Sequence, residues 1–156
     1  LHTAGCALGL PLRPWRESDA ALTDFGPPEA APPPGTEIIA PHLPEWTVTE
    51  DAVAGGIEMR LTDGVGTFRF ADTDLTAHSH GVERYRIAPD DPLSAEAEAR
   101  WEHALSRGDW RVSSRTQTRL TSDAGHFRIR ARVEVFEGEA RVHDESWDTR
   151  IPRDHV

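Results

Sequence analysis

Two histidines separated by one residue, His78 and His80, form the pattern in this sequence that comes closest to a metal site. On a β-strand such a pair projects to one side, and imidazole is a common ligand of zinc and copper. A third ligand could come from His103, His126 or His143. No carboxylate-rich motif accompanies the pair, so we expect two exposed histidines near a strand end rather than a metal centre.

Serine hydrolase chemistry requires a nucleophile on a strained Gly-x-Ser-x-Gly turn, with an acid and a histidine brought to it. No serine of the chain lies between two glycines at that spacing; the serines are Ser18, Ser79, Ser94, Ser106, Ser113, Ser114, Ser122 and Ser146. A serine triad within this chain is therefore not expected. We assign no catalytic, cofactor-binding or metal-binding residue, and we expect no cofactor.

The glycine-containing motifs are typical of turns. Gly55-Gly56 and Gly64-Val65-Gly66 lack the lysine and the Ser or Thr that follow in a phosphate-binding loop. Arg107-Gly108-Asp109 resembles an integrin-recognition tripeptide, but glycine and aspartate at this place are explained by a hairpin turn.

The element that carries most of these residues is a run of apolar/polar alternation from residue 97 to residue 151. Its apolar positions recur with a period of two and the runs are separated by short turns, which predicts an antiparallel β-meander. We expect the following residues to share one face: Ala97, Ala99, Trp101, His103, Leu105, Trp110, Val112, Ser114, Thr116, Thr118, Leu120, Phe127, Ile129, Ala131, Val133 and Val135. The other face carries arginines and glutamates.

Upstream of this run the pattern also favours strands. Residues 46–70 predict two strands joined by a tight turn at Asp63-Gly64, and residues 75–87 predict a strand pair or one long bent strand. Residues 94–105 are ambiguous because alanine and glutamate favour helix. The period of two accounts for more positions than a helical stripe does, so we predict a strand there.

The amino-terminal part of the chain has a different sequence pattern from the rest. Residues 1–13 alternate weakly and predict one strand. Residues 14–44 are rich in proline, which predicts an extended connector without a long helix. The predicted fold is therefore all-β: a mainly antiparallel meander over residues 45–156, forming a sandwich or open barrel, preceded by a proline-rich arm.

The side chains on the two faces suggest different roles. Arg111, Arg115 and Arg119 can pair across strands with glutamates, which predicts a solvated, charge-balanced face; a docking surface is the alternative. Trp101, Trp110 and Trp147 are expected in the core, with a sugar or lipid cleft as the alternative.

Composition limits the class of protein. The net charge of −10 argues against nucleic acid as a partner, and no apolar stretch is long enough to cross a membrane as a helix. The single cysteine, Cys6, cannot form an internal disulfide, so we expect a soluble cytoplasmic protein. All 17 basic residues are arginine, which suggests a GC-rich bacterial source.

Several segments together resemble the carboxy-terminal part of the CocE/NonD hydrolases, the relatives of cocaine esterase and X-Pro dipeptidyl-peptidase. These segments are ADTDL (71–75), ERYRIAPDDPLS (83–94), SRGDWRV (106–112), LTSDAGHF (120–127), FEG (136–138), WDTRIPRD (147–154) and, upstream, the proline-rich DFGPPEAAPP (24–33). The resemblance covers nearly the whole chain. Its motifs are turns and strand ends, which identify a family better than a function.

The resemblance implies that the chain is a non-catalytic accessory region of a serine hydrolase of the acyl ester or X-Pro peptide class. In that family an α/β-hydrolase domain carries the triad and a jelly-roll domain follows it, so the resemblance implies that residues 1–13 are a remnant strand of that preceding jelly-roll domain. None of the family's catalytic residues has a matching position here. The expected partner is that catalytic domain, in the same parent chain or a separate one; a homo-oligomer also stays open. The chain begins with Leu1, and both a fragment and a complete gene product remain open. The alternative is a free-standing β-barrel or sandwich that binds a small apolar ligand between Trp101, Trp110 and Phe127.

Overall fold

The computed structural model describes residues 9–21 and 25–154 and divides the chain into two units, residues 1–32 and 33–156. The first unit contains a short 3-10 helix, η1 (Glu17–Ala21). Arg13 pairs with Asp19 at 2.6 Å, and the backbone N–H of Arg16 donates to the same carboxylate at 2.8 Å. Residues 1–8 of the strand predicted over 1–13 lie outside the described residues, and residues 9–13 form no strand.

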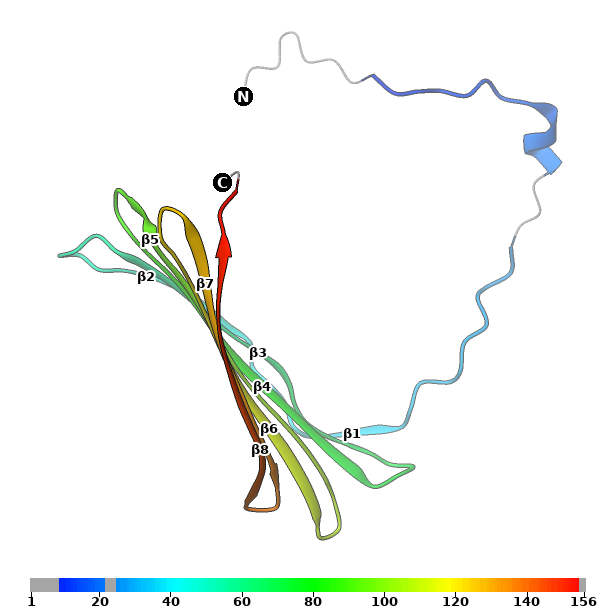
Figure 1. Ribbon diagram of the computed structural model, residues 1–156. Coiled ribbons are helices and arrows are strands. Elements are labelled where there is room, and N and C mark those ends of the chain that lie inside the picture. The colour runs from blue at the N-terminus through cyan, green and yellow to red at the C-terminus, as the bar shows by residue number, and fades with distance from the viewer. Residues whose placement is uncertain (1–8, 22–24, 155–156) are drawn as a thin grey trace. The chain divides into compact units, whose positions relative to one another are not determined.

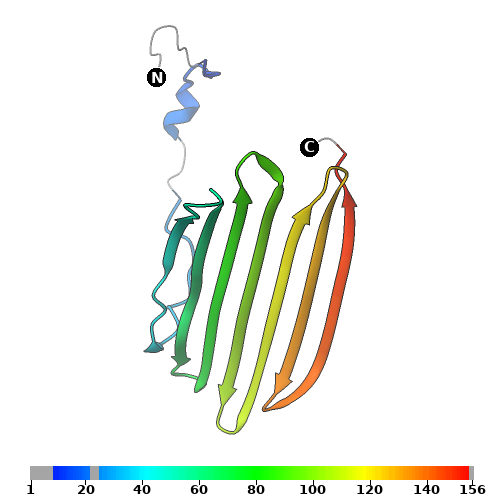
Figure 2. The same ribbon diagram turned by 90° about the vertical axis from the view of Figure 1, so that its left-hand side faces the viewer.

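The second unit is one open antiparallel sheet, built from the eight strands of the described chain. Figure 1 shows it nearly edge-on as a single layer, and Figure 2 shows the strands side by side. The strands are β1 (Thr36–Ala40), β2 (Glu45–Glu50), β3 (Ile57–Phe70), β4 (Leu75–Ala88), β5 (Asp91–Arg107), β6 (Trp110–Ser122), β7 (His126–Glu137) and β8 (Ala140–Pro152). From β3 to β8 each strand pairs with the next along the chain. The prediction of an all-β antiparallel meander is confirmed.

The edge of the sheet beside β3 is shared by two short strands. β1 pairs with the end of β3, with Thr36 opposite Phe70, and β2 pairs with its beginning, with Trp46 opposite Leu61. The connector predicted over 14–44 therefore already contains a strand of the sheet. The β-branched Thr36, Ile38 and Ile39 favour an extended backbone once the proline-rich stretch has ended.

The turn predicted at Asp63-Gly64 is wrong, because β3 runs through it. The register between β3 and β4 shifts between Asp63 and Gly66, so the extra residues form a bulge inside one long strand. Gly64 and Gly66 have positive φ angles of 138° and 71°. A side chain at Gly64 would place its Cβ 2.3 Å from the carbonyl oxygen of Ser79 on β4, so this position requires glycine for space as well as for conformation. The real hairpin between β3 and β4 lies at residues 71–74.

The other hairpin turns lie where the sequence predicted breaks. β5 is a 17-residue strand, so the prediction of strand rather than helix over 94–105 is confirmed. It turns into β6 through Gly108-Asp109 and Gly108 has a φ of 57°. The turn between β7 and β8 uses Gly138 in the same way, with a φ of 59°. Residues 75–87 belong to one long strand, the second of the two predicted possibilities.

Candidate interaction surface

The register of the strands gathers most of the apolar side chains on one face of the sheet. Residues paired across antiparallel strands point to the same side. Tyr85, Ala97, Leu120 and Ile129 form one such row from β4 to β7. The face predicted from the alternation is therefore confirmed, and we call it the apolar face. It comprises Ile57, Met59, Leu61, Phe68, Phe70, Leu75, Ala77, Tyr85, Ile87, Ala97, Ala99, Trp101, Leu105, Val112, Leu120, Phe127, Ile129, Ala131, Val133, Val135, Trp147 and Ile151.

Trp101 lies at the middle of the apolar face. It is directly opposite Gly81 on β4, and a Cβ on Gly81 would lie 2.6 Å from the indole ring. The indole therefore lies across the glycine, which is buried beneath it. His103 stacks against the same ring, with centroids 5.7 Å apart and an interplanar angle of 4°. Glycine at position 81 is needed because any side chain would push the tryptophan off the sheet.

Two shallow grooves lie on either side of the row that contains Trp101. One has a volume of about 330 Å³ and is lined by Met59, Tyr85, Leu120 and Phe127 among others. The second has a volume of about 400 Å³, and its lining includes Phe68, Ala77, Leu105, Val112 and Val135. The two grooves and the tryptophan between them give the apolar face an uneven surface, to which a partner can be complementary in shape.

Within the described residues of the second unit, no second layer packs on the apolar face. Among the described residues no hydrophobic side chain is buried, and large side chains remain substantially exposed: Tyr85 by 40%, Leu105 by 39% and Trp147 by 45%. A sheet normally buries its apolar face against helices or another sheet. An apolar surface that spans six strands is therefore a candidate site of association.

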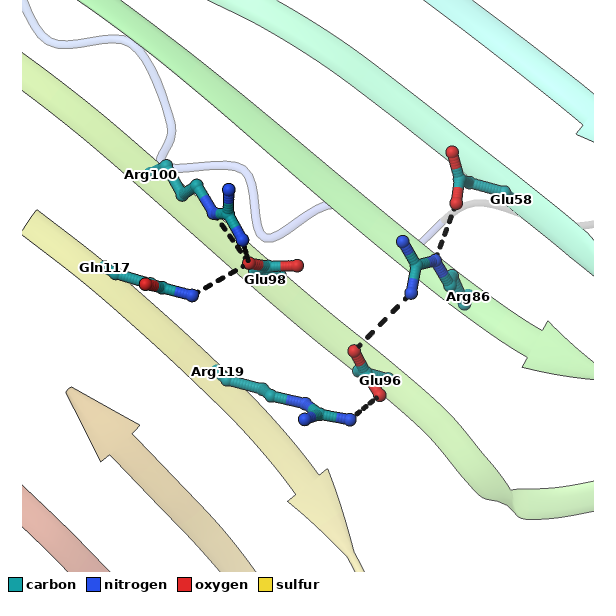
Figure 3. Close-up of polar contacts among 7 residues, drawn as sticks. All are labelled: Glu58, Arg86, Glu96, Glu98, Arg100, Gln117 and Arg119. Carbon is teal, nitrogen blue, oxygen red and sulfur yellow. Dashed lines mark hydrogen bonds and ion pairs between the residues drawn. The ribbon is translucent and has the colours of Figure 1, made fainter.

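The opposite face of the sheet carries a network of ion pairs, and we call it the charged face. Figure 3 shows one chain of contacts across four strands, in which Arg86 donates to Glu58 at 2.6 Å and lies 3.8 Å from Glu96. Arg119 completes the chain with a 2.6 Å bond to Glu96. A second set joins Arg100 and Gln117 to one oxygen of Glu98. These contacts agree with the predicted charge-balanced face. All of them except Arg100–Glu98, which lies within β5, connect neighbouring strands and so help to hold the register.

The charged face continues to β8 through bidentate pairs. Arg132 donates to both carboxylate oxygens of Asp144, at 2.9 and 2.8 Å. Arg128 binds Asp148 in the same manner, and Arg130 adds a weaker contact to that carboxylate. The hydrogen bond from Arg128, aided by the charges of both arginines, lowers the pKa of Asp148 to about 2. Its carboxylate therefore stays ionised in all but strong acid.

The histidines proposed as metal ligands do not meet. His78 and His80 both lie on the charged face, as an i, i+2 pair must, but His103 lies on the apolar face opposite Ser79. His143 is also on the apolar face, and His126 lies at the far end of the sheet opposite Pro152. His78 instead shares a 2.9 Å hydrogen bond with the hydroxyl of Thr67. Within the described chain no group of three His, Cys, Asp or Glu side chains could hold a metal ion.

The aromatic residues of the ligand-binding alternative are also separated. Phe127 lines the first groove, Trp101 lies between the two grooves, and Trp110 lies beside the hairpin turn at the start of β6, opposite Arg107. On an open sheet these three side chains do not enclose one cavity. The residue that the sequence reasoning missed is Gly81, which carries no signal by itself and becomes meaningful only once the register puts it beneath Trp101.

Comparisons with known proteins give no assignment. No protein-family model, no curated protein and no solved structure matches the chain. In the residues described, no helix is long and apolar enough to span a membrane.

Proposed function

We propose that this chain is a non-catalytic accessory region of a CocE/NonD-like serine hydrolase, and that its apolar face packs against the catalytic α/β-hydrolase domain. The observation that carries the proposal is the uncovered apolar face of an open sheet. The turn motifs resemble the carboxy-terminal part of those hydrolases, and for this reason we propose their catalytic domain as the partner.

The arrangement of the two faces supports a covering role. Most charged side chains of the charged face form ion pairs within the sheet, whereas no described residue packs over the apolar face. Covering apolar area contributes roughly 25 cal/mol for each Å² removed from water, so docking through this face stabilises both partners. The hydrolase then supplies the serine, aspartate and histidine, and the accessory sheet supports the domain that carries them.

Two simple tests address this function. An upstream reading frame that contains Gly-x-Ser-x-Gly, either in frame with the chain or adjacent to it, is expected in the source genome; an unrelated upstream gene would count against the proposal. The purified chain is expected to hydrolyse a generic ester no faster than buffer. Serine-dependent turnover by the chain alone would refute the non-catalytic role. We place the hydrolase in the cytoplasm because the chain has only one cysteine.

The second candidate is direct binding of a small apolar ligand, and the two grooves are what favours it. Their volumes of about 330 and 400 Å³ lie within the range of small-molecule sites. Both grooves lie on the face that docking would cover, so the two functions compete for it. Saturable binding of an apolar dye that persists after the hydrolase domain is added would favour the second candidate.

A further inference from the structure

A small pocket on the charged face is surrounded by three arginines. Arg60 of β3, Arg84 of β4 and Arg100 of β5 line it together with Val82 and Glu98, and its volume is about 110 Å³. The register puts Arg60 directly opposite Arg84, with Glu98 on the other side of Arg84. Three neighbouring strands therefore bring three guanidinium groups to one place.

Two of these arginines form ion pairs with carboxylates, whereas Arg84 lies opposite Glu98 without an ion pair to any described residue. Arg60 pairs with Glu45 at 2.8 Å, and Arg100 pairs with Glu98 at 2.6 Å. The Nε of Arg84 is buried and has no hydrogen-bond partner among the described residues. Buried polar groups in folded proteins nearly always have a partner, because leaving one unsatisfied costs free energy. Arg84 is thus the arginine of the pocket that has a hydrogen-bond donor left for a ligand.

The cross-strand pair of Arg60 and Arg84 is also unfavourable by itself. Like charges directly opposite each other on an antiparallel sheet repel. An anion held between them would turn this repulsion into two attractions and would satisfy the buried Nε of Arg84. Guanidinium groups bind planar carboxylates and phosphates with two parallel hydrogen bonds.

The other residues that line the pocket favour a carboxylate over a phosphate. Although burial raises the pKa of Glu98, the hydrogen bonds from Arg100 and Gln117 and the charges of Arg100 and Arg84 outweigh it, and the pKa lies below its ordinary value. Glu98 is therefore ionised and would repel a doubly charged phosphate more than a singly charged carboxylate. The volume equals that of roughly three or four liquid waters, which is sufficient for one carboxylate. Val82 offers an apolar contact to the carbon that bears it.

We propose that Arg60, Arg84 and Arg100 bind a carboxylate group, carried either by a small organic acid or by an acidic side chain of another protein. The site is distinct from the docking surface proposed above, because it lies on the opposite face of the sheet. Its failure would leave the accessory role intact, and the reverse also holds.

The test is a titration of the full chain followed by NMR of the arginine Nε–Hε signals, at constant ionic strength with chloride as the replaced anion. The probes are acetate, a peptide with one aspartate and both ends blocked, and inorganic phosphate. Acetate, the peptide or both are expected to shift the Arg84 signal. Binding of acetate alone assigns the site to a free acid, and binding of the peptide alone assigns it to a protein side chain. No carboxylate-dependent shift of Arg84, or tighter binding of phosphate, would overturn the proposal.

Two variants complete the test. Arg84→Gln is expected to weaken carboxylate binding at least about tenfold, since it removes charge-assisted hydrogen bonds. Arg111→Gln makes the same change of charge on the same face outside the pocket, and binding should be unchanged. Without ligand, Arg84→Gln should have about the same stability to urea as the wild type, because the repulsion from Arg60 and the attraction to Glu98 are lost together. A less stable Arg84→Gln would indicate that Arg84 serves the fold rather than a ligand, and this too would overturn the proposal.

Discussion

Replacing Gly81 by alanine tests the packing at the middle of the apolar face. The added Cβ would lie 2.6 Å from the Trp101 ring, about 1 Å closer than ordinary carbon contacts allow. The indole must therefore tilt away from the sheet and lose its stacking on His103. Overpacking of this kind costs about 1–3 kcal/mol, and we expect Gly81→Ala to lower the free energy of unfolding by that amount.

The assay is urea unfolding of the chain, followed by circular dichroism, in a double-mutant cycle with Trp101→Ala. With the indole removed, Gly81→Ala should cost little or become stabilising, because alanine loses less backbone entropy than glycine in a strand. Gly125→Ala is the matched control, since its Cβ would meet nothing closer than 3.8 Å. An equal cost for Gly81→Ala with and without the tryptophan would refute the proposed contact.

Three further predictions concern the ion pairs and turns of the sheet. Asp148→Asn should lower stability at neutral pH because the bond to Arg128 is lost. The folded-state pKa of about 2 lies below the ordinary aspartate pKa of 3.8, so the difference from wild type in urea melts should shrink as pH falls from about 4 to about 2. Glu96→Gln removes the acceptor shared by two arginines and should lower the free energy of unfolding in urea by about 0.5–1 kcal/mol, whereas Glu139→Gln at a hairpin turn should not. Gly108→Ala should cost about 1 kcal/mol because φ is 57°, and Gly108→Asn should cost less, as measured by thermal unfolding.

The alternation of the sequence was enough to predict much of the sheet. In strands β5 to β7 the residues expected on one face do share it, because the hairpin turns leave no offset between neighbouring runs: Ala97 pairs with Leu120, and Leu120 with Ile129. The choice of strand for residues 94–105 followed from the same period, although alanine and glutamate favour helix. Pairing on both sides of β5 overrides that local preference.

The wrong predictions concern sequence patterns that are compatible with two different structures. Asp63-Gly64 is typical of a hairpin turn, but glycines with positive φ also form bulges, and the long partner strand β4 decides between the two. The strand at Thr36–Ala40 was hidden by the prolines before it. His78 and His80 share the charged face and His103 lies on the apolar face, an arrangement set by a register that no single run of sequence contains.

The sequence predicts which residues each face of the sheet carries, but it does not predict what packs against or binds to each face. Alternation indicates that one face is apolar, yet it does not indicate what packs on that face, because the packing partner contributes its own residues. The contact between Gly81 and Trp101 and the arginine pocket around Arg84 both depend on which residues meet across strands. Neither feature has a signature along a single strand.

The most direct test of the proposed docking is hydroxyl-radical footprinting of the chain, alone and joined to an α/β-hydrolase domain of the proposed family, taken from the upstream reading frame that the proposal expects. Tyr85, Trp101 and Trp147 on the apolar face should be oxidised readily in the chain alone and protected when the hydrolase domain is present. Phe136 lies opposite Ser113 on the charged face, beneath the guanidinium of Arg115, and provides the internal control whose oxidation should not change. Equal oxidation of the apolar-face residues in both preparations would contradict the account.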